Sequence, residues 1–300
     1  MEWMKTVEVD EHFVGFSTKE LLKAFLIPKR VRGRLRQARR IKVNGRYQPI
    51  STVLALGDRI EMRFESADFI TAQSSYVPDQ SQQPQIIYEN ADLLIVNKPR
   101  NVKTHPNSPG ETGTMLNFVQ GYLQEQSGTA SAYMVHRLDS ATTGALLVAK
   151  NPVVVPILNQ QLRDKTLQRT YLAWVDGLFD EAQGVIELPI GIDPDDNRKR
   201  MVGGTLPLAA RTRWIKIHQV LDHTLVRIEL ASGRTHQIRV HFAAVGHPLV
   251  GDQLYNLTES YPAGLLLHAA ALKFVLPFSD QTVSLAAALP DDFPRNLKEF

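Results

Sequence analysis

A short polar loop between two apolar runs constrains this chain more than any other feature. The loop spans His136 to Gly144, and the four residues before it and the five after it have the composition of buried strands. Asp139 is the only carboxylate in the loop, while His136 and Arg137 are able to contact an anionic partner. Polar side chains on a loop between rigid supports are typical of active sites, although a polar turn capped by an aspartate is the alternative interpretation.

Composition narrows the classes of protein to consider. The chain has 300 residues, 43% of them hydrophobic, and no cysteine, which excludes disulfides and thiolate metal sites and fits a reducing cytoplasm. The first residues lack the pattern of a secretion signal, and the most apolar window, residues 265–276, is too short to span a membrane and contains His268 and Lys273. We expect a cytoplasmic monomer without a membrane partner.

Positive charge is concentrated near the N-terminus. Residues 19–46 contain eleven lysines or arginines and one acid, Glu20, a local charge of +10 in a chain of net charge +3. The rest of the chain is therefore net acidic, at −7. Such a block repels itself unless phosphates neutralise it, which indicates a nucleic-acid partner, and a solvated basic face is the alternative.

The N-terminal region predicts a small α+β domain. We expect a first helix after Ser17 or Thr18, a second basic helix over residues 31–40, a hairpin turn at Asn44-Gly45, and a strand over residues 59–64. This pattern resembles the S4 RNA-binding domain, with Arg40 at a position where many S4 domains have glycine. The resemblance implies RNA contacts by the basic residues, which are Lys29, Arg30, Arg32, Arg34, Arg36, Arg39, Arg40 and Lys42.

The remaining sequence predicts a linker over residues 66–85 and a second domain over residues 86–300, after an N-terminal domain of residues 1–65. Residues 66–85 are rich in Ser, Gln, Asp and Pro without a sustained period. Helical spacing follows over residues 114–126 and after Asn151-Pro152, where Pro156 requires the helix to begin late or to kink. Strands are expected over residues 86–88, 93–96, 169–175, 186–192, 210–217 and 224–231, with a polar loop over residues 193–204.

A further helix is expected after Ser232-Gly233, capped by Thr235 and closed by Gly246 and Pro248. Arg234 would then lie at the N-terminus of this helix, a place that favours anions.

Other kinds of site have little support. His236 and His241 are five residues apart, so they do not share a helical face, and no other zinc pattern is present. Neither a phosphate-binding P-loop nor a dinucleotide-binding glycine motif occurs, so no nucleotide cofactor is expected. A hydrolase built from Ser140, His136 and Asp139 would have poor geometry, because all three lie in one loop.

Several motifs together resemble the RluA family of RNA pseudouridine synthases. Residues 136–144 resemble the family signature HRLDxxTSG, and Lys98-Pro99 and His105-Pro106 match a second motif in which Asn101 replaces a glycine. Arg169-Thr170-Tyr171 and residues 233–252 match two more, in the family's order. The resemblance implies an α+β fold with a mixed, largely antiparallel sheet, preceded by the S4-like domain.

The resemblance also assigns roles to residues. It implies Asp139 as the catalytic carboxylate, Arg234 as the cation placed against it, and Tyr171 as an active-site tyrosine that stacks on the uracil. His136 and Arg137 would contact RNA, with Arg137 filling the gap left by a flipped base. Neither a cofactor nor a metal is implied, and ribosomal RNA is favoured over transfer RNA as the substrate. A non-catalytic RNA-binding or ribosome-assembly factor on the same scaffold is the alternative.

Overall fold

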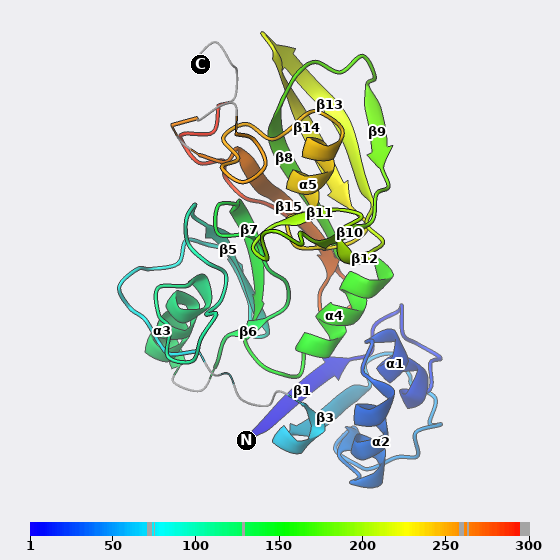
Figure 1. Cartoon of the computed structure of the whole chain (residues 1–300). Coiled ribbons are helices and arrows are strands. Elements are labelled where there is room, and N and C mark those ends of the chain that lie inside the picture. Colours follow the sequence, from blue (N-terminus) through cyan, green and yellow to red (C-terminus); the bar gives the residue numbers. More distant parts are fainter. Residues whose placement is uncertain (71–73, 75, 128–129, 258–260, 263, 295–300) are drawn as a thin grey trace.

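The structure is a computed structural model, and it describes residues 1–70, 74, 76–127, 130–257, 261–262 and 264–294. A small N-terminal part lies beneath a larger part that is built around one long sheet (Figure 1). The predicted linker is described apart from residues 71–73 and 75, and the predicted second domain lies within the described residues apart from 128–129, 258–260, 263 and 295–300.

The N-terminal part packs two helices against a three-stranded antiparallel sheet in the order β1-β3-β2. Its elements are β1 (Glu2–Glu8), α1 (Thr18–Ala24), α2 (Lys29–Gln37), β2 (Ile41–Val43) and β3 (Arg59–Glu65). Ser17 caps α1 in a capping box with Glu20, and the turn between Val43 and Arg46 places Asn44 at φ 51° and Gly45 at φ 76°. Strand β1 was not predicted, because its side chains alternate only between half-buried and exposed.

A buried ion pair extends this part beyond the boundary expected at residue 65. Ser66–Asp68 form a short 3-10 helix, η1, and the Asp68 carboxylate accepts two hydrogen bonds from the Arg40 guanidinium at 2.8 and 2.9 Å. Asp68 and Arg40 are both buried, and Arg30 Nη2 donates to the Asp68 carbonyl at 2.8 Å. The first three residues of the predicted linker are therefore folded against α2 and β3.

Among the described residues, the large sheet has ten strands, and their pairing is antiparallel except between β7 and β15. The fold class is therefore the mixed, largely antiparallel α+β arrangement that was predicted. In spatial order the main strands are β4 (Ile86–Glu89), β5 (Leu93–Lys98), β7 (Thr143–Ala149), β15 (Leu267–Val275), β8 (Gln168–Asp176), β14 (His223–Leu230), β13 (Thr212–Val220) and β9 (Gln183–Ile186). Strand β16 (Thr282–Ala286) pairs with β15, and β6 (Tyr133–Met134) pairs with β7.

Helices cover both faces of the sheet. Along β5 and β7, residues such as Ile95 and Leu147 pack towards α4 (Val155–Asp164) and the N-terminal part, whereas Val96 and Leu146 pack towards α3 (Met115–Ser127) and α5 (Gln237–Ala244). This alternation follows from the two-residue period of a strand. Because both faces are covered, β5 and β7 are almost continuously apolar.

Two expectations from the sequence need adjustment in this part. The single strand expected over residues 186–192 is divided at Leu188 and Pro189 into β9 and β10 (Ile190–Ile192), because proline cannot donate to a strand ladder. The loop expected over residues 193–204 contains β11 (Arg200–Val202), which pairs with β10, and β12 (Thr205–Leu208) completes a separate small sheet. Helix α4 begins late, as expected, which places Pro156 in its first turn.

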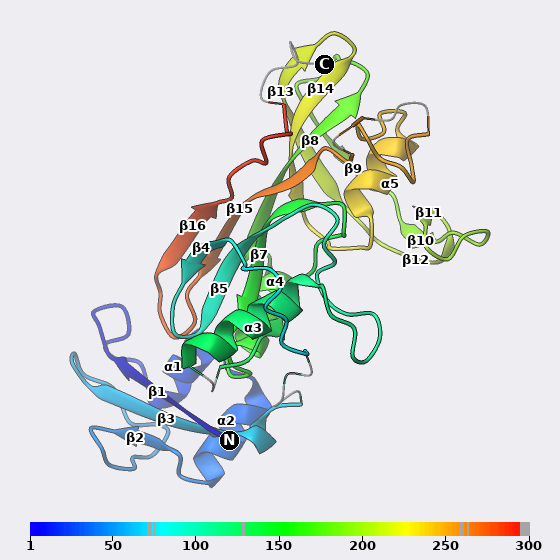
Figure 2. The same cartoon turned by 90° about the vertical axis from the view of Figure 1, so that its left-hand side faces the viewer.

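The two parts of the chain lie against each other (Figure 2), and one cluster of buried apolar residues includes side chains from both. Phe278, between β15 and β16, lies with its ring centroid 5.7 Å from Phe25 and 6.2 Å from Phe64 of the N-terminal part. Lys5 forms an ion pair with Asp92 across the same contact. The N-terminal part is therefore held against the large sheet by packing as well as by the connecting chain.

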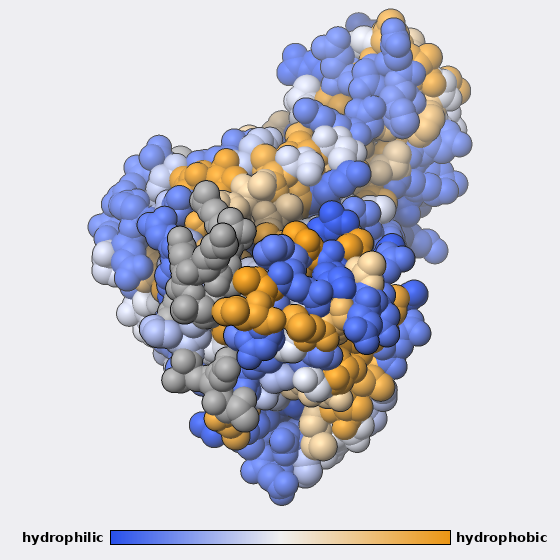
Figure 3. All heavy atoms as spheres, turned by 90° about the horizontal axis from the view of Figure 1, so that it is seen from above, coloured by the Kyte–Doolittle hydropathy of each residue, from blue (hydrophilic) through white to orange (hydrophobic). Residues whose placement is uncertain are grey.

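The connecting chain also contacts the large part. Asn117 Nδ2 donates to the Val77 carbonyl at 2.8 Å, and the Gly113 amide donates to Asp79 at 2.8 Å. Among the described residues, the structure contains no helix with the length and apolar character needed to cross a membrane. On the face seen from above, hydrophilic residues prevail and apolar residues lie in patches between them (Figure 3).

Candidate active site

The loop that carries Asp139 connects β6 to β7 and is held from below by hydrogen bonds. Thr104 Oγ1 accepts from the Leu138 amide at 3.0 Å and donates to the Leu138 carbonyl at 2.7 Å. The Thr142 amide donates to the Asp139 carbonyl at 3.1 Å, which closes a turn. The expected polar loop between two strands is therefore present, with a fixed backbone at Asp139.

Lys98 supports the same loop from inside the protein. Its buried ammonium donates to the carbonyls of Pro99, Val102 and Ser140 at 2.8, 2.8 and 3.0 Å. Burial lowers the pKa of Lys98 to about 7, and the charge of Asp139 acts in the opposite direction. The sequence analysis matched Lys98 to a motif but gave it no role. Its place at the end of an apolar strand was the signal that this lysine would be buried.

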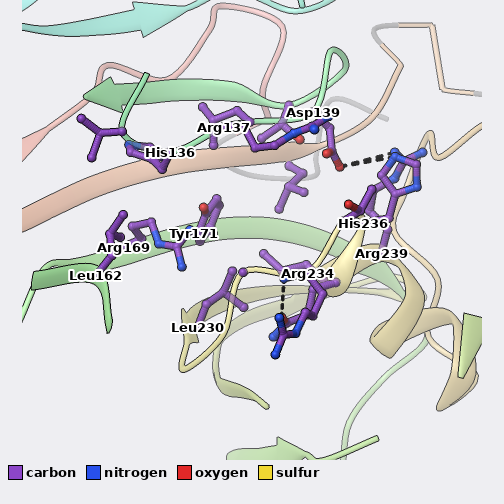
Figure 4. A pocket seen from close by; sticks show the side chains of 18 of the residues that line it. His136, Arg137, Asp139, Leu162, Arg169, Tyr171, Leu230, Arg234, His236 and Arg239 are labelled. Carbon is purple, nitrogen blue, oxygen red and sulfur yellow. Dashed lines mark hydrogen bonds and ion pairs between the residues drawn. The ribbon is translucent and has the colours of Figure 1, made fainter. Parts of the chain in front are cut away.

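Asp139 opens into a pocket of about 350 Å³ between the loop, β8, the end of α4 and the start of α5 (Figure 4). It is the only carboxylate among the described residues that line this pocket. The other ionisable side chains at the pocket are mostly basic, and they are His136, Arg137, Arg163, Lys165, Arg169, Tyr171, Arg234, His236 and Arg239.

Two groups from the start of α5 face the Asp139 carboxylate. Arg239 Nη1 lies 3.6 Å and His236 Nε2 lies 3.8 Å from Asp139 Oδ2. Arg239 is itself fixed, because its Nε and Nη2 donate to the two carboxylate oxygens of buried Asp252 at 2.8 and 2.7 Å. Burial lowers the pKa of His236, and the charge of Asp139 opposes that effect.

The predicted pairing of Arg234 with Asp139 was wrong in this structure. Arg234 is exposed, its Nε donates to the Ala209 carbonyl at 3.1 Å, and in Figure 4 its side chain points away from Asp139. The helix begins at Gln237, after a left-handed His236 at φ 58°, so Thr235 does not cap it and Arg234 stays on the preceding loop. Arg239 lies in the first turn of the helix and is buried. In the sequence it stands between Ile238 and Val240, which was the signal that this arginine would lie inside the protein.

Tyr171 lies at the predicted place in the pocket. It lies on β8 with 4% of its surface exposed, opposite Ile228 of β14 and beside Ala269 of β15. Burial raises the pKa of Tyr171, while the nearby charge of Arg169 lowers it. Its hydroxyl is therefore protonated at neutral pH.

His136 does not offer the charge that an RNA phosphate would need. The ring is buried, its Nε2 accepts a hydrogen bond from the Leu147 amide at 3.1 Å, and burial lowers the pKa of His136 to about 3. The RNA contact predicted for His136 is therefore not an ion pair with a phosphate, and the neutral imidazole supports β7 from the wall of the pocket. Arg137 is exposed at the pocket and remains available to a ligand.

The predicted RNA-binding residues of the N-terminal part divide into three groups. Five of them are exposed, and they are Lys29, Arg30, Arg36, Arg39 and Lys42. Arg32 and Arg34 are half-buried. Arg40 was predicted wrongly as an RNA contact, because its guanidinium is buried against Asp68.

Basic side chains line two grooves beside the pocket, and the sequence analysis had not selected Lys165, Arg211 or Arg213 among them. Two adjoining grooves of about 470 and 330 Å³ share Lys165 and Arg211. One of them also contains Arg234 and Glu187, and the other contains Arg169, Arg213 and Glu229. These residues come from separate elements, so no run of charge along the sequence indicated them. Among the described residues, no three His, Cys, Asp or Glu side chains gather as they would around a metal ion.

Comparisons with known proteins cover both parts of the chain. A family model described as RNA pseudouridylate synthase matches residues 92–244, and one described as RluD ribosomal pseudouridine synthase N-terminal domain matches residues 5–60. The RNA pseudouridine synthase YhcT of Bacillus subtilis is 36% identical over 253 residues, which cover 84% of this chain and 82% of that protein. The ribosomal large subunit pseudouridine synthase D of Haemophilus ducreyi is 30% identical over 306 residues, with 96% and 92% covered.

Solved structures show the same fold. Human RNA Pseudouridylate Synthase Domain Containing 4 aligns with a TM-score of 0.58 at 21% identity, over 70% of this chain and 90% of that one. Human RNA Pseudouridylate Synthase Domain Containing 1 aligns with a TM-score of 0.56 at 26% identity, over 72% and 87%.

Proposed function

Because this chain belongs to the RNA pseudouridine synthase family, whose members are isomerases that act on RNA, we propose that it converts uridines of ribosomal RNA to pseudouridine with Asp139 as the catalytic carboxylate. One observation carries the proposal: among the described residues, Asp139 is the single carboxylate that lines this pocket, and the other ionisable groups are cations, neutral histidines and the Tyr171 hydroxyl. Two groups fixed on α5 face that carboxylate, so its position is set before RNA binds.

The reaction explains why one carboxylate is sufficient. Uridine isomerisation breaks the bond between C1′ and N1, turns the uracil and joins C5 to C1′; one proton leaves C5 and one is gained at N1. Asp139 acts either as the nucleophile at C1′ or as the base on a neighbouring sugar proton. In both cases the carboxylate has to be ionised in a pocket that excludes water, and the Arg239 guanidinium at 3.6 Å supplies the compensating charge.

Tyr171 and Arg137 complete the proposed site. The Tyr171 ring stacks on the uracil, and its hydroxyl, which is protonated in the free protein, gives up its own proton as it accepts the one that leaves C5. Because the reacting atoms are inaccessible in a stacked helix, the target nucleotide is turned out into the pocket. Arg137, exposed beside Asp139, occupies the gap that the nucleotide leaves.

The RNA on either side of the target lies in the two basic grooves at the mouth of the pocket. Lys165, Arg169, Arg211 and Arg213 line these grooves and would contact phosphates. The exposed cations of α2 and its surroundings contact a more distant part of the same RNA, which is the S4-like role expected of this region.

The names of similar proteins favour ribosomal RNA over transfer RNA as the substrate. The relative that aligns along 96% of this chain is named for the ribosomal large subunit, and the match to the N-terminal part carries a ribosomal name as well. The proposal places the protein in the cytoplasm with its substrate and describes it as a monomer that needs no cofactor.

Single-turnover conversion of ribosomal RNA by Asp139→Asn tests the proposal. This change removes the anion at nearly constant shape, so RNA binding should persist while pseudouridine formation falls by more than about 1,000-fold. Asp180→Asn is the matched control, because Asp180 is exposed and does not line the pocket. Substantial conversion by Asp139→Asn would remove Asp139 from the chemistry, and a wild-type protein that converts ribosomal RNA no faster than transfer RNA would overturn the choice of substrate.

A further inference from the structure

Tyr255 contacts both groups that face Asp139, although it does not line the pocket itself. Its hydroxyl lies 2.9 Å from His236 Nδ1, and its ring lies 5.2 Å beneath the guanidinium carbon of Arg239. The ring also meets the His236 imidazole edge to face, at 5.6 Å between centroids. One side chain thus supports the imidazole and the guanidinium that lie within 4 Å of the Asp139 carboxylate.

A third contact determines which way the Tyr255 hydroxyl points. The backbone amide of Arg200, at the start of β11, donates to the Tyr255 oxygen at 2.9 Å. That amide can only donate, so the oxygen accepts there and its own proton is left for His236 Nδ1. In the part of the chain that the structure describes, no second acceptor for this hydroxyl is recorded.

The direction of this bond fixes the tautomer of His236. An imidazole that accepts at Nδ1 carries its proton on Nε2, and Nε2 is the atom 3.8 Å from Asp139 Oδ2. The opposite tautomer would direct the Nε2 lone pair at the carboxylate and leave the tyrosine proton without a partner. Burial lowers the pKa of His236, so the ring is neutral at neutral pH and offers this N–H rather than a full charge.

We propose that Tyr255 is a positioning residue for uridine isomerisation, which keeps the Nε2–H of His236 directed at Asp139 and holds the Arg239 guanidinium beside it. The inference rests on the proposed function and extends it to a residue sixteen positions beyond Arg239. The small sheet of β10, β11 and β12 becomes part of the site through the Arg200 amide, because that amide orients the hydroxyl.

The charged and titratable groups around His236 affect its protonation. Asp139 and Asp252 favour a charged imidazole, whereas Arg239 and Arg200 disfavour it, and Tyr255 donates to it. Asp252 also anchors the turn that carries Tyr255, by accepting from the amides of Leu254 and Tyr255 at 2.9 and 3.3 Å. The tyrosine and the arginine are therefore fixed by the same buried carboxylate.

The experiment combines imidazole nitrogen NMR with single-turnover kinetics on the full chain. The spectrum of wild-type protein with 15N-labelled histidine, with His236 identified by its loss in His236→Gln, should show the Nε2–H tautomer. Tyr255→Phe keeps the ring and loses the hydroxyl, so the His236 signals should move towards a mixture of tautomers and conversion should slow by roughly tenfold at unchanged RNA affinity. Tyr122→Phe is the control: it also loses a hydroxyl with a hydrogen bond, to Glu89.

Three results would overturn the inference: an Nδ1–H tautomer in the wild type, a tautomer unchanged in Tyr255→Phe, or an equal loss of rate in Tyr122→Phe. These results differ from a failure of the proposed function, in which wild-type protein would convert no uridine. The NMR measurement needs no RNA, so an unchanged tautomer counts against the role of Tyr255 even when the wild-type enzyme is fully active.

Discussion

At the scale of single residues, two arginines of one motif make different contacts. Arg239 makes two hydrogen bonds to Asp252 and faces Asp139, whereas Arg234 bonds one carbonyl and is exposed. We expect Arg239→Lys to slow conversion by about 30-fold or more, because lysine keeps the charge but cannot hold both contacts with a planar fork. Arg234→Lys should remain within about threefold of the wild-type rate.

Single-turnover rates of the two variants, measured on the same RNA, check this prediction. Thermal melting of each protein controls for loss of structure, because Arg239 also stabilises a buried carboxylate. A larger rate loss in Arg234→Lys than in Arg239→Lys would restore the assignment made from the sequence.

At the scale of elements, the catalytic loop depends on how closely β7 approaches β15. Gly144 begins this approach at φ 109°, and a Cβ atom added there would lie 2.3 Å from the Ala269 carbonyl oxygen. Gly144→Ala should therefore push the strands apart, lower the free energy of unfolding by about 3 kcal/mol and displace the loop that holds Asp139. Urea denaturation and single-turnover conversion measure the two effects.

Gly33→Ala provides the matched control. Gly33 lies within α2, has no atom within 4 Å of an added Cβ, and keeps an ordinary helical conformation. This variant should be more stable than wild type by roughly 0.5–1 kcal/mol, since alanine is the better helix former. Equal stability of the two variants would show that the approach of β7 to β15 tolerates a side chain.

At the scale of the whole molecule, the N-terminal part is docked on the large sheet while its cations face outwards. Removing residues 1–65 would expose Phe278, so substitutions at the end of α2 and directly after it give a cleaner test. Replacing Arg36 and Arg39 together by alanine should weaken RNA binding and reduce the slope of log affinity against log salt by about 1.5, since each lost phosphate contact accounts for roughly 0.7–0.9.

Binding measured at several salt concentrations gives that slope. Lys273→Ala removes an exposed cation of β15 outside both basic regions and should leave the slope unchanged. A slope unaltered by the replacement of Arg36 and Arg39 would mean that this basic face does not contact the RNA.

The sequence by itself determined the features that depend on neighbouring residues. The period of apolar residues predicted most strands and helices. The Asn44-Gly45 turn and the capping box at Ser17 depend on adjacent residues alone, and Asn101, which replaces a glycine of the motif, has a positive φ of 63° that asparagine tolerates. The polar loop and its single carboxylate could likewise be predicted from the sequence, because the loop and the apolar runs on either side of it are consecutive residues.

Tertiary structure decided which charges meet. Arg40 was indistinguishable from its basic neighbours until Asp68, twenty-eight positions later, was seen to pair with it. In the same way Arg239 reaches Asp139 from α5 while Asp252 and Tyr255, from a later turn, hold Arg239 in place, and Arg234 is left outside by the left-handed turn at His236. The spacing of apolar residues along the sequence indicates whether a residue is buried. The partner of a buried charge depends on chain segments that come together only in the folded protein.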